Sequence, residues 1–97
     1  MQDQEPFAFR LYVAGDTPNS LQARRHLTVL CESHLPGRHR VEIVDVFLEP
    51  EQALADGIFL TPMLVKLSPM PVQRIVGTLA QLDVVLQTLG LAQAVAP

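Results

Sequence analysis

The chain has 97 residues, of which 48% are hydrophobic, and this composition fits one folded domain with its own core rather than a disordered segment. Seven Lys and Arg against ten Asp and Glu give a net charge of −3, which argues against nucleic acid or an anionic membrane as the partner. No apolar run approaches the roughly 18 residues that a membrane span needs. Residues 1–5 are polar and acidic, unlike a signal peptide, so we expect a cytoplasmic protein.

The first predicted strand covers residues 7–14, because its side chains alternate with a period of two. One face carries Phe7, Phe9, Leu11 and Val13, and the other carries Ala8, Arg10, Tyr12 and Ala14. Gly15 permits a sharp turn, Thr17 is placed to cap a helix, and Pro18 suits the first helical position. The helix is predicted to run to about His34.

A second strand is predicted over residues 40–47, which makes a right-handed crossover and a parallel strand pair with the first. Asp45 interrupts this apolar run, and we expect its carboxylate to reach solvent or a backbone donor. Pro50 begins a short predicted helix that continues from Glu51 to Asp56 and ends at Gly57.

Residues 63–67 and 72–76 are two strand-like runs around a segment with two prolines, which predicts an antiparallel hairpin. Thr78 and Gln81 have the spacing of a capping box, and an apolar helical stripe follows until Gly90 closes it. The stripe consists of Leu79, Leu82, Val85, Leu86 and Leu89. Local signals after residue 50 conflict, because 83–89 suits a strand as well as a helix.

The predicted order β-α-β-α-β-β-α is that of a single-domain α/β protein with a thioredoxin-like fold, with a core over 7–91 and flexible termini at 1–5 and 92–97. A thioredoxin-type protein carries a Cys-x-x-Cys pair in the loop after its first strand, and this loop has no cysteine. Cys31 is alone near the far end of the predicted helix, and with His34 it lacks a third metal ligand. We therefore expect no thiol-redox enzyme, no catalytic residue, no metal and no other cofactor.

Three segments of the chain resemble the KaiB family of clock proteins. They are LYVAGDTPNS at 11–20, VEIVDVFLEP at 41–50 and LTPMLVKLSPMPVQRIVG at 60–77. The resemblance implies a non-enzymatic regulatory protein of a circadian or timing system that docks on a KaiC-type ATPase hexamer. It also implies KaiA-like or histidine-kinase partners. A stress-response adaptor of the same fold, with a different protein partner, is the alternative.

The resemblance further implies two folds. One is the thioredoxin-like state that binds the ATPase ring, and the other is a ground state ordered β-α-β-β-α-α-β that self-associates to a dimer or tetramer. The half that switches in this family lies after residue 50, where the local signals of this chain conflict.

The chain also departs from the clock members of the family. Gln22, Gly57 and Gln73 stand where those members commonly have Lys or Arg. Thr88 and Gly90 replace the Gly and Asp of the usual Ile-Gly-Leu-Asp run. The sequence is therefore similar to a divergent member.

A candidate partner-binding surface follows from the resemblance and from charge placement. It comprises Tyr12, Gly15, Asp16, Asn19, Lys66 and Arg74. Lys66 and Arg74 are cations within apolar strands, so each is expected to point outward or to meet an acid. An arginine can hold a carboxylate with two hydrogen bonds, which would suit an acidic loop on the ATPase. Tyr12 is either an aromatic anchor or a core tyrosine.

Overall fold

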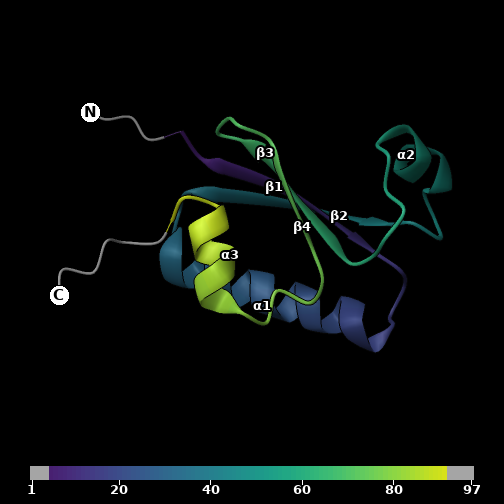
Figure 1. Ribbon diagram of the computed structural model, residues 1–97, viewed down its shortest axis with the longest axis horizontal. Helices are drawn as coiled ribbons and strands as arrows, with labels where there is room; N and C mark the ends of the chain where they lie inside the picture. The colour runs from purple at the N-terminus through teal and green to yellow at the C-terminus, as the bar shows by residue number, and fades with distance from the viewer. Residues whose placement is uncertain (1–4, 92–97) are drawn as a thin grey trace, which may run out of the picture.

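The computed structural model describes residues 5–91. Within that range the elements are β1 (Phe7–Val13), α1 (Pro18–His34), β2 (His39–Asp45), α2 (Pro50–Ala55), β3 (Met63–Ser68), β4 (Gln73–Val76) and α3 (Leu82–Thr88), as Figure 1 shows. The predicted order of elements is confirmed, and the differences fall at element ends. The termini predicted to be flexible lie outside the described residues, except Glu5.

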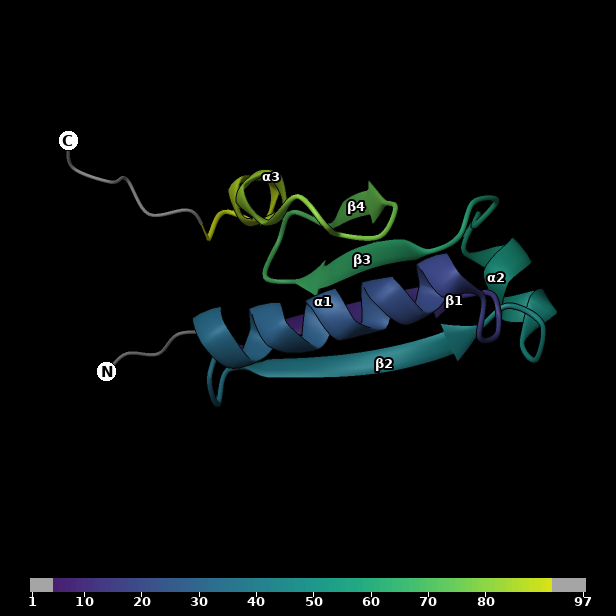
Figure 2. The same cartoon turned by 90° about the horizontal axis from the view of Figure 1, so that it is seen from below.

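The described strands form one sheet in the order β2-β1-β3-β4. β1 pairs with β2 in parallel, and β3 pairs with both β1 and β4 in antiparallel, which confirms the predicted crossover and hairpin. Helices α1 and α3 cover one face of the sheet, while α2 lies on the other face at the end where β1 and β2 stop (Figures 1 and 2).

The larger core lies between the sheet and α1 with α3. Its buried members are Phe7, Phe9, Leu11, Val13, Ala23, Leu27, Leu30, Cys31, Leu35, Leu64, Leu79, Val85 and Leu89. The apolar face of β1 predicted from its period-two pattern is thus confirmed. Complete burial of one Leu or Phe side chain contributes roughly 1.5–3 kcal/mol, so this cluster supplies most of the hydrophobic stabilisation.

A smaller core lies between the opposite face of the sheet and α2. It consists of Tyr12, Val44, Ala53, Ile58, Met63 and Val65. Helix α2 has only six residues and buries a single side chain of its own, Ala53. Its attachment to the sheet therefore depends on contacts that flank the helix.

The capping box expected at Thr78 and Gln81 is wrong, because α3 begins later, at Leu82, with Gln81 as N-cap and no side-chain capping bond. Leu79 has φ = 64°, a left-handed conformation that a helix excludes. Its side chain is buried in the larger core, and the Thr78 carbonyl accepts a hydrogen bond from His26 Nδ1 at 2.7 Å. Tertiary packing has overridden the local signal.

The predicted end of the last helix is confirmed. Gly90 has φ = 77°, its N–H donates to the carbonyl of Gln87, and the N–H of Leu91 donates to the carbonyl of Leu86. These two bonds define a Schellman motif, in which glycine avoids the steric penalty of the left-handed conformation.

The turn between β1 and α1 is held by the side chains of Ser20 and Asp45 rather than by a capping bond from Thr17. Thr17 is the N-cap of α1, but its side chain makes no capping bond. The Ala14 N–H instead donates to Ser20 Oγ at 3.0 Å. Asp45 Oδ1 accepts from the N–H groups of Gly15 and Phe47, at 3.2 and 2.9 Å, as expected of a carboxylate with backbone donors.

Candidate functional site

Three loops meet at the end of the sheet where α2 lies. Val13 of β1 pairs with Asp45 of β2, and Tyr12 pairs with Met63 at the start of β3. The chain segments that leave β1, leave β2 and enter β3 are therefore neighbours (Figure 2). We call residues 14–19 and 46–62 together the α2-end surface. It contains the loop in which thioredoxin-type proteins carry their cysteine pair.

Large apolar side chains are exposed on the α2-end surface. They are Phe47, Leu48, Leu54, Phe59 and Leu60, which are between 61% and 80% exposed. Exposed apolar patches on small soluble domains commonly mark sites of protein contact. Sequence reasoning missed these residues. The signal available to it was the pairing of adjacent apolar residues: Phe47-Leu48 at the end of the strand predicted over 40–47, and Phe59-Leu60 outside any predicted strand or helix.

A partly buried polar cluster attaches this surface to the sheet. The Tyr12 hydroxyl donates a hydrogen bond to Asp56 Oδ2, just after α2. Arg10 Nη1 lies 3.5 Å from both the Tyr12 hydroxyl and Asp56 Oδ2, and Arg10 Nε donates to Glu42 Oε1 at 2.8 Å. Burial, together with the bond to Asp56, raises the pKa of Tyr12. The bonds to Tyr12 and Glu42 raise the pKa of Arg10.

Arg74 of β4 holds the residues that follow α2. Its Nη2 donates to the carbonyl of Asp56 at 2.6 Å, and its Nη1 donates to the carbonyl of Gly57 at 3.4 Å. The carbonyls at a helix C-terminus lack helical partners and carry partial negative charge, so a guanidinium is a favourable partner there.

The structure brings some of the sequence-predicted site residues together. Gly15, Asp16 and Asn19 lie on the α2-end surface, and Arg74 borders it. Gly15 has φ = 56°, and the Phe47 ring lies 3.4 Å from the position that a β-carbon would take there. Tyr12 is only 1% exposed, so it supports the surface from beneath and is a core tyrosine rather than an exposed anchor.

Lys66 lies elsewhere. It pairs with Gln73 whereas Arg74 pairs with Val65, so the two cations project from opposite faces of the sheet. Lys66 is 4% exposed, and its Nζ lies 5.6 Å from the centroid of the Phe7 ring. No ion pair of Lys66 is present within residues 5–91. The expectation that Lys66 points outward or meets an acid is wrong: a cation–π contact takes the place of the acid.

Cys31 is placed where thiol chemistry is unfavourable. It is 1% exposed in the larger core, and burial, with a smaller effect of Glu32, raises the pKa of its thiol from 9.0 to about 11. A reactive cysteine has a lowered pKa and access to solvent. His34 is exposed whereas Cys31 is buried, so the two side chains lie in different environments. Among residues 5–91 no three His, Cys, Asp or Glu are grouped to hold a metal ion.

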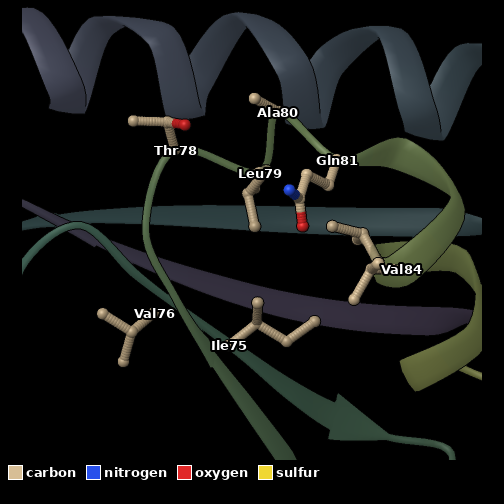
Figure 3. A pocket seen from close by; sticks show the side chains of 8 residues that line it. Ile75, Val76, Thr78, Leu79, Ala80, Gln81 and Val84 are labelled. Atoms are coloured by element: carbon tan, nitrogen blue, oxygen red, sulfur yellow. The ribbon is translucent and has the colours of Figure 1, made fainter.

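Two hollows lie away from the α2-end surface. One, of about 360 Å³, lies between β4 and α3, where Ile75, Leu79 and Val84 converge (Figure 3). Its lining has no acidic, basic or thiol side chain, so it offers no group for acid–base catalysis. The other, of about 440 Å³, lies between α1 and β2 and includes Cys31 and His39. His39 Nδ1 donates a hydrogen bond to the carbonyl of Leu35. The pKa of the Cys31 thiol in this hollow is raised rather than lowered.

The fold and the single, buried Cys31 define a class of protein: a thioredoxin-like domain without a cysteine pair in the loop after its first strand. The N-terminal domain of SasA from Synechococcus elongatus has a similar structure, with a TM-score of 0.72 and 17% identity over 99% of this chain and 94% of that one. The Drosophila melanogaster thioredoxin Deadhead is also similar, with a TM-score of 0.71 and 12% identity over 92% and 84% of the two chains. These likenesses concern the fold.

Sequence comparison identifies the family. Residues 10–91 match the model of the KaiB domain. The chain is 40% identical to the circadian clock oscillator protein KaiB of Prochlorococcus marinus strain MIT 9313, over 94% of this chain and 76% of the relative. It is 38% identical to the protein of the same name from Synechococcus elongatus, over 94% and 89%. The chain belongs to the KaiB family.

Membership of this family supports a clock regulatory role. Across residues 5–91, every helix falls short of the length and apolar character that crossing a membrane requires.

The contact between Tyr12 and Asp56 predicts the effect of removing one hydroxyl. We expect Tyr12→Phe to lower the free energy of unfolding by about 1–2 kcal/mol, because the Asp56 carboxylate loses its buried donor. Denaturant unfolding of Tyr12→Phe, Asp56→Asn and the double variant measures the coupling, expected at about 0.5–3 kcal/mol. Because the pKa of folded Tyr12 is raised, the hydroxyl stabilises the fold below pH 10, and this contribution is lost as pH rises through the folded value. Additive single effects would contradict the contact.

The environment of Cys31 predicts a slow thiol that stays protonated at neutral pH. We expect Ellman's reagent to label native protein far more slowly than protein unfolded in guanidinium. The raised pKa also stabilises the fold below pH 9, and this contribution, on the order of 2 kcal/mol, is lost as pH rises from 9.0 to about 11. Urea titrations of wild type and Cys31→Ala across that range isolate the effect. Equal labelling of the native and unfolded protein would overturn this interpretation.

Proposed function

We propose that the chain is a non-enzymatic cytoplasmic regulatory protein that docks on a KaiC-type ATPase hexamer through the α2-end surface. The observation that carries the proposal is the exposed apolar group of Phe47, Leu48, Leu54, Phe59 and Leu60 on a KaiB-family domain. Side chains of this size exposed on adjoining loops provide area that a partner can bury. KaiA-like and histidine-kinase partners belong to the same proposal.

The predicted site residues have different roles in this arrangement. Gly15, Asp16 and Asn19 would contact the ring directly, and Arg74 would lie at the border of the contact. Tyr12 would act through Asp56, whose position fixes the end of α2. Lys66 lies on the opposite face of the sheet and outside this docking surface.

Truncation of the exposed apolar side chains tests the docking surface. We expect Leu48→Ala and Phe59→Ala each to weaken binding to a purified KaiC-type hexamer by about tenfold or more, as buried interface anchors do. Their stability should stay within about 0.5 kcal/mol of wild type, because both side chains are exposed. Biolayer interferometry measures the affinity, and thermal melting measures the stability.

Val29→Ala is the matched control, because Val29 is an apolar residue of α1 with 54% exposure outside the α2-end surface. If all three variants bind the hexamer as wild type does, the ring contacts another surface. If the wild-type protein does not bind the hexamer, the alternative function, a stress-response adaptor with a different protein partner, describes the chain better.

We further propose that residues 50–91 can adopt the second order, β-α-β-β-α-α-β. Supporting this proposal, the elements of that half are short: α2 has six residues, β4 has four and α3 has seven. Helix α2 also depends on the cluster at Asp56 rather than on a large buried face of its own. Two packings of one sequence can interconvert when they differ by a few kcal/mol.

Dilution tests the proposed switch. A self-associating ground state is favoured by mass action, so dilution should increase the thioredoxin-like monomer. We expect amide NMR of a concentration series to show two sets of peaks for residues 50–91, with relative intensities that follow the oligomer fraction from light scattering. A single thioredoxin-like set at every concentration, without an oligomer, would exclude the switch in the isolated protein.

A further inference from the structure

We propose that the α2-end surface accepts a partner whose contact area is apolar and bordered by Lys and Arg side chains. The proposal rests on the proposed function for the site at which docking occurs, and it specifies the chemistry of what docks there. It follows from how charge is distributed over the described residues.

Negative charge is concentrated on this surface. Residues 14–19 and 46–62 contain four carboxylates, those of Asp16, Glu49, Glu51 and Asp56, and no Lys, Arg or His. The other residues hold six carboxylates and all seven Lys and Arg. The two segments thus carry −4, which exceeds the net charge of −3 of the whole chain, and the remainder is slightly positive.

Three of these carboxylates lie close in sequence to the exposed apolar side chains. Asp16, Glu49 and Glu51 are exposed. Asp16 follows Gly15, over which the Phe47 ring lies, and Glu49 with Glu51 separates Leu48 from Leu54 along the chain. An interface of this kind has an apolar centre and a charged rim, and the rim governs the rate and specificity of association.

Two cations that contact this surface, Arg10 and Arg74, are already engaged. Arg10 contacts Glu42 and Asp56, and Arg74 donates to the carbonyls of Asp56 and Gly57. The first six residues of α1, 18–23, are uncharged. The rim carboxylates therefore face outward without a cation of their own surface to balance them, which favours a partner that brings positive charge.

A second copy that presented the same surface would place like charges opposite one another, which disfavours it as the occupant. The inferred partner chemistry also differs from the sequence-based expectation, in which Lys66 and Arg74 belong to the binding surface and an arginine holds an acidic loop of the ATPase. Lys66 is buried on the other face, and the guanidinium of Arg74 is bound to the backbone after α2.

The test compares two charge-neutralised variants of the full chain. The first combines Asp16→Asn, Glu49→Gln and Glu51→Gln. The second, the matched control, combines Glu5→Gln, Glu32→Gln and Asp83→Asn, which are exposed carboxylates outside the α2-end surface. Both change the net charge equally, so only the location of the lost charge differs.

The first probe is an amphipathic helical peptide of Lys, Leu and Ala, with its Glu-for-Lys counterpart. When the Lys peptide is added to the wild-type protein, we expect the changes in amide NMR chemical shift to be concentrated in residues 14–19 and 46–62. We also expect about tenfold weaker binding by the surface variant, less than about twofold by the control, and weakening with salt. Shifts elsewhere, equal binding of the Glu peptide, or equal losses in both variants would overturn the proposal.

The second probe is the purified KaiC-type hexamer. If the wild type and the surface variant bind it equally, the charge inference fails while the proposed function stands. If the hexamer does not bind but the Lys peptide maps to the α2-end surface, the proposed function fails while the charge inference stands. Concentration-dependent self-association that only the surface variant abolishes would assign the surface to a second copy and overturn the proposal.

Discussion

The hydrogen bond from the buried Tyr12 hydroxyl to the carboxylate of Asp56 is central to the position of α2. A helix of six residues is too short to be stable alone, and α2 buries only Ala53. The bond joins the centre of the sheet to the residue that follows the helix, and Arg10 and Arg74 add further donors to the same residue. With α2 fixed there, the two loops that flank it cross the end of the sheet. Phe47, Leu48, Phe59 and Leu60 on these loops remain in solvent.

Most of the fold could be predicted because its first half is specified locally. The period of two in β1 and the proline at the start of α1 act within a few residues of where they stand, and the structure has both elements where they were expected. The start of α3 could not be predicted, because it depends on the burial of Leu79 and on the bond that His26 makes to Thr78. The hydrogen bond joins positions 52 residues apart in sequence.

The candidate site was harder to predict than the fold. Gly15, Asp16 and Asn19 could be proposed from the sequence, because the loop after β1 is recognisable from its own residues. Phe47 and Phe59 are exposed because of where α2 packs on the sheet, and no local sequence pattern predicts that position. Lys66 and Arg74 look equivalent in sequence, yet the pairing of β3 with β4 sends them to opposite faces. Only the register separates a buried ammonium from a guanidinium at the border of the site.

The strand order has a consequence for aggregation. The two outer strands of the described sheet are β2 and β4, and an outer strand offers unpaired backbone groups to any other chain. β4 has four residues and follows a segment with two prolines, whereas β2 carries the charges of Arg40, Glu42 and Asp45. Short length, proline and charge all discourage strand addition between copies. The apolar α2-end surface consists of a helix and loops, so it can attract a partner without serving as a template for fibre growth.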